Sequence, residues 1–282
     1  MKNRSLEIRP ITLTIGAEIG GIDLAKPLTE AVRQEVRSAL LEFGVIFFRD
    51  QTITPEQQVA FARNFGALAV LRTPSKENPH VSEVRKEPEA TRNTGGNWHT
   101  DEAYTDRPDM GTILLAREIP EAGGDTMFAS MYNAYDTLSD GMKKTLLELR
   151  GVHAKATSLD PRNLPPERRF TEAEIAATAS RTHKAVHPVA PRHPDNGRRL
   201  LYVSPTYTAQ FEGWTEEESR PLLQYLFDHA SRPENTCRFR WEVGSIAFWD
   251  NRAVWHRALN DYHGSRRLMH RVAIAGNGFG AS

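Results

Sequence analysis

The chain has 282 residues, of which 39% are hydrophobic and 26% are charged, ordinary proportions for a globular protein with a sizeable buried core. Lysine plus arginine and aspartate plus glutamate both number 36, so the charge gives no reason to expect a nucleic acid or a membrane as partner. The single cysteine excludes an internal disulfide framework. No apolar run is long enough to span a bilayer and the first residues do not resemble a signal peptide, so we expect a cytoplasmic protein.

Short strands and two helices are predicted for the first part of the chain. Residues 6–24 alternate apolar and polar positions and are interrupted by glycines, which indicates two short strands and a turn. Residues 31–41 follow the helix-capping Thr29 with apolar positions on one helical face, and residues 45–48 are typical of a buried strand. Thr54 is predicted to start a second helix, because proline follows it at the first helical position.

The rest of the chain predicts more strands and two more helices. A Gly-Gly turn separates predicted strands at residues 111–119 and 125–130, and a helix is expected to start near residues 137–140. A capping box at residues 215–218 opens a helix at residues 219–230. Further strands are predicted at residues 186–190, 200–203, 237–241, 245–249 and 268–274.

No internal repeat, low-complexity tract or linker divides the chain, so residues 1–282 are predicted to form a single domain. Many short strands with flanking helices are typical of a mainly β, α+β protein built as a double-stranded β-helix, a cupin-like jelly roll. Residues 70–97 and 155–185 are long, polar and irregular. Loops of that length in a compact domain are often functional, so we predict that both segments are lids over a site.

The segment Asn97-Trp98-His99-Thr100-Asp101 carries the first candidate metal ligands. Side chains two residues apart on a strand point to the same side, so His99 and Asp101 can face one ion. With the distant His256 they form a 2-His-1-carboxylate triad, which suits non-haem Fe(II) and leaves positions open for a co-substrate and O₂. Taken alone, a histidine close to an aspartate is equally typical of a surface turn.

Further motifs follow in a characteristic order. A Gly-Gly-Asp-Thr run occupies residues 123–126, and Arg267 follows His256 by eleven residues (267 − 256 = 11). In this order the sequence resembles the taurine dioxygenase (TauD/TfdA) family of Fe(II)- and 2-oxoglutarate-dependent oxygenases. The resemblance extends from residues 15–19 to residues 271–274 and implies the jelly-roll fold.

The resemblance implies that His99, Asp101 and His256 hold Fe(II), with 2-oxoglutarate as co-substrate and O₂ as oxidant. The expected reaction hydroxylates a small-molecule substrate and releases succinate and CO₂, while the protein supplies orientation and excludes side reactions. Relatives that halogenate lack the metal-binding carboxylate, so the presence of Asp101 favours hydroxylation.

The same resemblance implies that Arg267 and the Thr126 hydroxyl bind the far carboxylate of 2-oxoglutarate. Arginine suits this role because its fork donates two charge-assisted hydrogen bonds to a carboxylate. Arg271 lies four residues further along the predicted strand and therefore shares the face of Arg267. In similar family members this arginine meets the anionic head of the substrate or shares the co-substrate. Two buried arginines require bound anions or acidic partners.

Three positions depart from the taurine-specific pattern. Leu71 occupies the place of a histidine, Gly95 that of an asparagine, and Glu102 that of a small apolar residue. These departures argue against taurine, and the expected substrate is an anionic sulfonate, alkyl sulfate or aryloxyalkanoate.

Two other functions remain open from the residues alone. A metal-dependent hydrolase could hold Zn²⁺ with the same triad, and a non-catalytic small-anion binder could keep the fold and the arginines. Neither explains all the motifs, because the hydrolase gives no role to Thr126 and Arg267 and the binder needs no metal triad. We also expect a homo-oligomer, a dimer or tetramer. Among the other histidines, His187 is the one most suited to contact the site.

Overall fold

Short strands and a few helices make up the structure, a computed structural model that describes residues 5–71, 73–155 and 183–279. The strands are β1 (Glu7–Pro10), β2 (Ala17–Gly20), β3 (Val45–Phe48), β4 (Ser82–Lys86), β5 (Gly111–Glu118), β6 (Thr126–Ser130), β7 (Arg150–Ala154), β8 (Lys184–Pro188), β9 (Thr208–Phe211), β10 (Thr236–Phe239), β11 (Ile246–Asp250), β12 (Val254–Ala258) and β13 (Arg267–Ile274). The helices are α1 (Glu30–Phe43), α2 (Pro55–Arg63), α3 (Met131–Asp136), α4 (Asp140–Leu147), α6 (Glu216–Ala230) and the 3-10 turn η2 (Pro233–Asn235).

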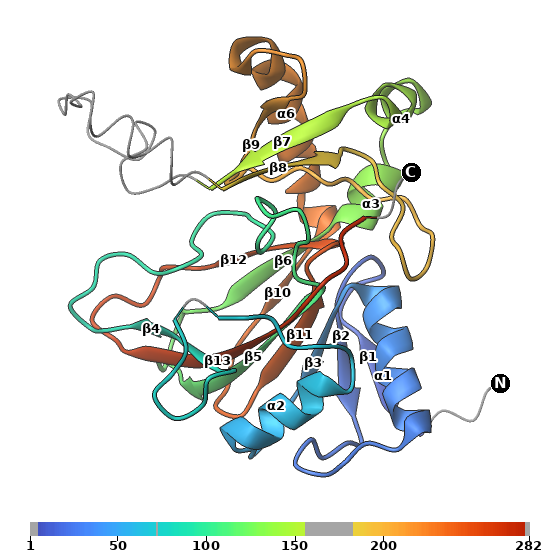
Figure 1. The fold of residues 1–282 in the computed structure, drawn as a ribbon. Coiled ribbons are helices and arrows are strands. Elements are labelled where there is room, and N and C mark those ends of the chain that lie inside the picture. Colours follow the sequence, from blue (N-terminus) through green and yellow to red (C-terminus); the bar gives the residue numbers. More distant parts are fainter. Residues whose placement is uncertain (1–4, 72, 156–182, 280–282) are drawn as a thin grey trace.

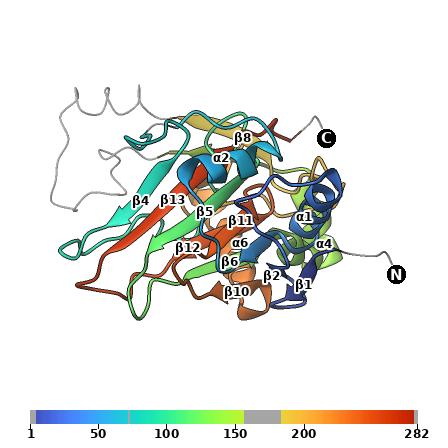
Figure 2. The same cartoon turned by 90° about the horizontal axis from the view of Figure 1, so that it is seen from below.

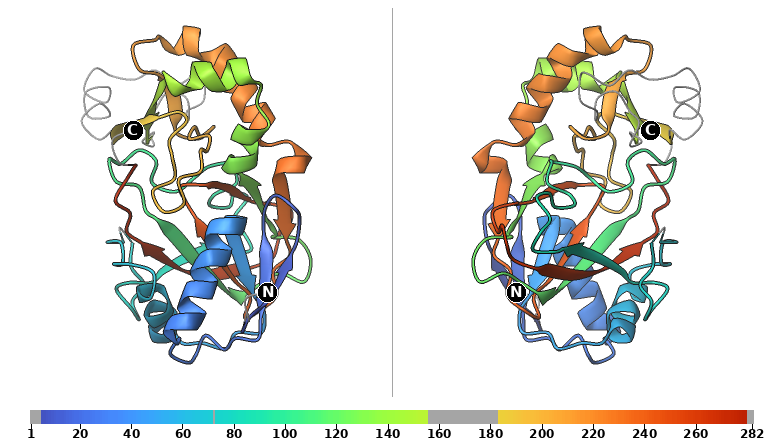
Figure 3. Two further views of the ribbon diagram at one scale, coloured as in Figure 1. Left: turned by 90° about the vertical axis from the view of Figure 1, so that its right-hand side faces the viewer. Right: turned by 90° about the vertical axis from the view of Figure 1, so that its left-hand side faces the viewer.

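The strands form a large sheet and two small ones within the described residues. The large sheet has the order β1-β2-β3-β11-β5-β13-β4, and the small sheets have the orders β10-β6-β12 and β8-β7-β9. The sheet of β7, β8 and β9 lies with α4 and α6 at one end of the molecule, and α1 and α2 lie towards the other end (Figures 1 and 3). Seen from below, α2 lies over β13, against which it packs (Figure 2).

Aromatic side chains fill the space between the large sheet and the sheet of β10, β6 and β12. Phe47 of β3 stacks on Phe239 of β10 with ring centroids 4.0 Å apart, and its edge meets Phe128 of β6 at 5.5 Å. Phe128 also contacts Trp249 of β11 at 5.6 Å. Ile46 belongs to the separate cluster on the other face of the large sheet, towards α1 and α2, as strand alternation requires. Two facing sheets with a shared core are the arrangement that the predicted jelly roll needs.

Most of the predicted elements are present, and their ends carry the predicted caps. The Thr29 side chain accepts a hydrogen bond from the backbone N–H of Val32 at the start of α1, and Thr54 forms a capping box with Gln57 at the start of α2. Thr215 forms the capping box that opens α6. These signals are local, so the sequence predicts them well.

Two predictions about regular structure are wrong. Residues 200–203 are buried but form no strand, because their N–H groups bond to carbonyls outside any strand: Leu200 and Tyr202 to Pro191 and Val189 in the segment after β8, and Leu201 to Met131 at the start of α3. The segment 70–97, expected to be irregular, contains β4.

The charged sequence of β4 fits its place at the edge of the large sheet, where it pairs only with β13. Closure of residues 70–97 as a lid stays a prediction, as does the single domain. Of the second expected lid, 155–185, residues 156–182 lie outside the described residues.

A buried ion network fixes the connection between β11 and β12. Arg252 donates to both carboxylate oxygens of Asp250, at 2.8 and 2.6 Å, and to Asp195 at 2.7 Å. His193 lies 3.0 Å from Asp250 through its Nε2. Burial opposes the ionised form of Asp250, but Arg252 outweighs it and holds the pKa below its usual range. Because a guanidinium already holds both carboxylates, this cluster is an ion network and not a metal site.

Replacing one member of this network should strongly destabilise the fold. Asp250→Asn leaves the buried Arg252 guanidinium without its main counter-charge, so the free energy of unfolding should fall by about 3–5 kcal/mol. Urea unfolding measures the loss. The matched control is Asp136→Asn, which removes an exposed ion pair with Arg198 and should change stability little. Equal effects of the two substitutions would contradict a structural role for the network.

Candidate active site

The two candidate metal histidines face each other across a backbone bridge. His99 donates its backbone N–H to the carbonyl of His256 at 3.1 Å, and His256 donates to the carbonyl of His99 at 2.8 Å. Residues paired in this way point their side chains to one face, and the ring centroids are 4.1 Å apart. His256 lies on β12, and His99 comes from the loop before β5. The backbone therefore sets the spacing of the two rings.

Asp101 brings a carboxylate to the same face. Its Oδ1 lies 3.6 Å from Nε2 of His99 and 3.7 Å from Nε2 of His256. The candidate ligand atoms of the three residues all lie within 4.8 Å of one another. These separations are too long for hydrogen bonds, so the three atoms face a common point without sharing a proton. A cation at that point would satisfy all of them.

The backbone fixes the tautomer of His99. Its Nδ1 lies 2.8 Å from the carbonyl oxygen of Asn97. Since a carbonyl only accepts, Nδ1 carries the proton and Nε2 presents its lone pair to the triad. Orientation of a ligating histidine through its other nitrogen is common in metal sites. Here the backbone carbonyl of Asn97, and not its side chain, orients His99.

The second oxygen of Asp101 is held by the sheet. Arg271 of β13 donates to Oδ2 at 3.0 Å, and the Thr112 hydroxyl of β5 donates to the same oxygen at 2.9 Å. Asn251 donates to Thr112 at 3.1 Å and accepts from the indole N–H of Trp249 at 2.7 Å. This chain leaves Oδ1 to face the histidines. The sequence does not indicate Thr112 and Asn251, because long-range strand pairing brings them to the site.

The protonation states suit a divalent cation. Burial disfavours ionised Asp101, but the nearby charge of Arg271, followed by the histidines, holds its pKa well below the usual value. Burial lowers the pKa of His256 to about 3, and His99 acts in the same direction. The site therefore offers a carboxylate and a neutral imidazole, the forms in which these groups bind metal. By this test the residues fit an iron ion of the kind that 2-His-1-carboxylate sites bind.

Arg267 is buried without an acidic partner in the part of the chain that the structure describes. Arg267 is the first residue of β13 and is 4% exposed. Its Nε and Nη2 atoms have no hydrogen-bond partner among the described residues. Burial lowers its pKa. Arg267 Cδ would lie 3.4 Å from a Cβ atom at Gly124, so this glycine of the Gly-Gly-Asp-Thr run packs directly against it. An open guanidinium fork in a buried place is suited to a carboxylate.

Arg271 has acidic partners where Arg267 has none. Besides the hydrogen bond to Asp101, its Nη2 lies 4.0 Å from Asp109. Burial works against its charged form, but these carboxylates, with Glu102, raise its pKa above the ordinary value. The expectation that buried arginines have acidic partners or anions is met at Arg271, and an anion at Arg267 stays a prediction. Arg271 supports the candidate metal ligand directly.

Asp109 is a further group that the sequence did not indicate. Burial raises its pKa to about 7, Arg271 opposes the rise, and the charges of Glu102 and Asp101 add to it. The residue precedes β5, next to the segment that carries Thr112. A carboxyl with so high a pKa beside a cluster of ionisable groups is typical of functional sites.

Two of the three substrate-side departures lie against the triad. Gly95 has φ +76°, and a Cβ there would lie 3.2 Å from Cε1 of His99, so a side chain at this position would require the His99 ring to shift. Glu102, at φ 55°, acts electrostatically on Arg271 and Asp109. Leu71 is half-buried.

His187 supports the segment after Asp101 and does not join the triad. Its Nε2 lies 3.1 Å from the carbonyl of Ala103 and 3.0 Å from that of Thr105. Two carbonyl acceptors fix the proton on Nε2. Its relation to the site is therefore indirect: this histidine connects the backbone that follows the candidate ligand to β8.

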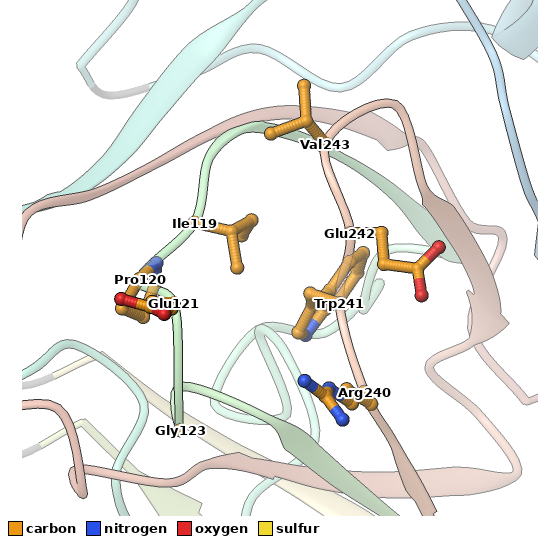
Figure 4. A pocket seen from close by; sticks show the side chains of 8 residues that line it. All are labelled: Ile119, Pro120, Glu121, Gly123, Arg240, Trp241, Glu242 and Val243. Atoms are coloured by element: carbon orange, nitrogen blue, oxygen red, sulfur yellow. The ribbon is translucent and has the colours of Figure 1, made fainter.

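A small surface cavity of about 240 Å³ opens between residues 119–123 and 240–243 (Figure 4). None of the candidate metal ligands lines it. Trp241 does, and its indole N–H donates to the Thr126 hydroxyl at 2.9 Å while Arg267 Cζ lies 5.8 Å from its ring centroid. Trp241 therefore borders both the cavity and the buried Thr126 and Arg267.

The chain is similar to proteins of known activity over nearly its whole length. Residues 7–273 match the family described as taurine catabolism dioxygenase TauD, TfdA family. Over 278 residues the chain is 33% identical to the alpha-ketoglutarate-dependent sulfate ester dioxygenase of Pseudomonas putida, covering 96% of this chain and 90% of the relative. Over 286 residues it is 31% identical to the alpha-ketoglutarate-dependent 2,4-dichlorophenoxyacetate dioxygenase of Cupriavidus pinatubonensis, covering 95% and 97%.

A solved structure extends the comparison to the fold. The crystal structure of a taurine dioxygenase from Burkholderia xenovorans is similar with a TM-score of 0.81 at 36% identity, covering 97% of this chain and 92% of that chain. The predicted fold class is thereby confirmed. No helix among the described residues is both long enough and apolar enough to cross a membrane.

The raised pKa of Asp109 predicts a pH-dependent stability of the metal-free protein. Between its ordinary value and about 7, the folded state keeps a proton that the unfolded chain has released, so stability falls as pH rises through this window. Asp109→Asn removes this loss, and the variant should gain stability over the wild type as pH rises from about 4 to about 7. Urea unfolding with a chelator present measures it.

The matched control for this prediction is Glu89→Gln, which changes an exposed carboxyl. Its difference in unfolding free energy from the wild type should stay constant over the same pH range. A pH-independent difference for Asp109→Asn would show that the Asp109 carboxyl ionises as easily in the folded protein as in the unfolded chain.

Proposed function

Because the chain belongs to the taurine catabolism dioxygenase TauD/TfdA family, we infer that it is a 2-oxoglutarate-dependent non-haem iron dioxygenase. We propose that His99, Asp101 and His256 hold the Fe(II) ion, that Thr126 and Arg267 hold the far carboxylate of 2-oxoglutarate, and that Arg271 completes the co-substrate and substrate side. The enzyme hydroxylates a small organic substrate, with 2-oxoglutarate and O₂ consumed and succinate and CO₂ released.

One observation carries the assignment of the metal ligands. Two imidazole nitrogens and one carboxylate oxygen face a common point, and no hydrogen bond joins them. Three protein ligands leave further coordination positions free, as a site that must also bind a chelating co-substrate and O₂ requires. When bound, iron with 2-oxoglutarate supplies the oxidising chemistry, and the protein supplies binding and orientation.

The chain's own residues have definable tasks in this reaction. The Asn97 carbonyl keeps the proton of His99 on Nδ1, so Nε2 stays available as a ligand. Arg271 and Thr112 hold Oδ2 of Asp101. Oδ1 is therefore left to face the histidines and the ion that they would hold. Arg267 and Thr126 would fix the far end of the co-substrate, and so orient its chelating end. Each task is positioning, performed by groups already in place in the folded chain.

The substrate proposed is an anionic sulfonate, alkyl sulfate or aryloxyalkanoate. Relatives whose names specify a sulfate ester and 2,4-dichlorophenoxyacetate support this range. Taurine is disfavoured, because Gly95 occupies the place of the asparagine that taurine-specific members use, and a Cβ atom there would lie only 3.2 Å from Cε1 of His99.

The hydrolase and the non-catalytic binder have no support in the comparisons, since the relatives named above are dioxygenases. We further propose a cytoplasmic enzyme, because a reducing compartment keeps iron ferrous and thiols free. A homo-oligomer, dimer or tetramer, is proposed on the general frequency of symmetric assemblies among enzymes.

Anaerobic titration tests the metal ligands. Fe(II) followed by 2-oxoglutarate should produce a weak visible charge-transfer band in the wild type, and substrate-dependent CO₂ release should follow on exposure to air. His99→Ala and Asp101→Ala should abolish both, well beyond the roughly 10–100-fold losses typical of outer groups. His263→Ala changes an exposed histidine and serves as control. Absence of the band in the wild type at saturating ligand would overturn the proposed function.

Arg267→Ala tests the carboxylate clamp. Loss of two charge-assisted hydrogen bonds should weaken 2-oxoglutarate binding roughly 100-fold or more, with iron binding retained. The matched control is Arg266→Ala, because Arg266 is the neighbour of Arg267 in the chain but pairs with Glu118 at the surface. Wild-type affinity in Arg267→Ala would show that the far carboxylate binds elsewhere. Screening sulfonates, alkyl sulfates and aryloxy acids for CO₂ release identifies the substrate.

A further inference from the structure

A second buried cation lies directly opposite Arg267. β4 and β13 are antiparallel, and their register pairs Lys86 with Arg267. Residues directly opposite in such a pair point their side chains to the same face of the sheet. Lys86 is 3% exposed and Arg267 is 4% exposed. Two positive charges are therefore buried side by side at one end of the large sheet.

Neither cation has a carboxylate within ion-pair distance among residues 5–71, 73–155 and 183–279. Lys86 Nζ donates to the carbonyl oxygen of Tyr262 at 3.2 Å and lies 4.2 Å from the centroid of the Tyr262 ring. Arg267 keeps two N–H groups without a partner. The nearby Asp125 is engaged by Arg238 at 2.6 Å. The positive charge of this pair is thus left uncompensated by the described side chains.

Such a pair is costly unless an anion binds to it. Like charges directly opposite on neighbouring strands destabilise a sheet. A buried cation also loses its hydration, and without a counter-charge nothing offsets that loss. The carbonyl and ring of Tyr262 relieve part of this cost for Lys86, but they carry no formal negative charge. A bound carboxylate would neutralise one of the two charges and accept hydrogen bonds from both side chains. The lysine ammonium has three N–H donors, and the arginine guanidinium can donate two parallel hydrogen bonds.

We propose that Lys86 is a second cation of the co-substrate site, which acts with Arg267 on the far carboxylate of 2-oxoglutarate. This inference rests on the proposed function. Arg267 fixes the orientation of the carboxylate through its planar fork, and Lys86 adds a point charge from the neighbouring strand. The pair makes the site selective for a 2-oxo acid that ends in a carboxylate, because an uncharged end leaves both cations unpaired.

The test separates the far carboxylate from the chelating end of the ligand. Binding to the Fe(II)-loaded, anaerobic protein is measured by calorimetry for 2-oxoglutarate and for 2-oxopentanoate, which has the same five-carbon chain without the far carboxylate. Lys86→Met should raise the dissociation constant of 2-oxoglutarate about 10–100-fold and leave that of 2-oxopentanoate within about twofold. Lys86→Arg should recover most of the affinity. Lys26→Met, at an exposed lysine, should change neither.

Two results would overturn the proposal. Either Lys86→Met binds 2-oxoglutarate as the wild type does, or it weakens both ligands equally, which is the result of a purely structural lysine. Should Lys86→Met fail to fold, Lys86→Gln keeps a polar hydrogen-bond donor without the charge and is held to the same expectation. Failure of the proposed function differs from both, because the wild type itself would then bind no 2-oxoglutarate in the presence of Fe(II).

Discussion

The candidate site depends on the hydrogen bonds that hold one oxygen of Asp101 and leave the other free to face the histidines. Oδ2 is fixed by Arg271 and Thr112, and Oδ1 is thereby left to face the two histidines. A carboxylate without such partners would rotate, and both oxygens would compete for the ion. The partners come from β13 and β5, which are neighbours in the large sheet. The ligand is thus oriented by the most regular part of the fold, although it lies in a loop.

The arginines of β13 show how one strand serves two ends of a site. Arg267 and Arg271 share a face, but Arg271 lies among carboxylates while Arg267 has none within ion-pair distance in the described chain. A guanidinium that already has acidic partners stabilises protein groups, and one with open donors is available to a ligand. Sequence periodicity makes the two residues equivalent. Their surroundings, which depend on strand order, make them different.

This contrast marks how far the sequence could predict the site. The two-residue spacing predicts that His99 and Asp101 share a face, and motif order indicates His256 and Arg267, because these signals are local or carried by spacing. The sequences of β4 and β13 do not determine the register in which the two strands pair, so the sequence could not predict that Lys86 lies opposite Arg267. Residues 200–203 show the same limit in the fold: their apolar run predicts a strand, but their hydrogen bonds go to a bend and to the start of α3. Long-range pairing decides both cases.

The turn between β11 and β12 links the stability of the fold to the geometry of the site. Asp250 enters the buried ion network with Arg252 and His193, and the next residue, Asn251, donates to Thr112, which holds Asp101. The Asn251 carbonyl also accepts from the hydroxyl of Thr100, between the two ligands of the loop. A shift of this turn would therefore move the support of Asp101 together with the start of β12, which carries His256. Because buried polar networks of this kind are costly to rearrange, the candidate ligands are held close to their binding positions by the fold itself, before any ion is bound.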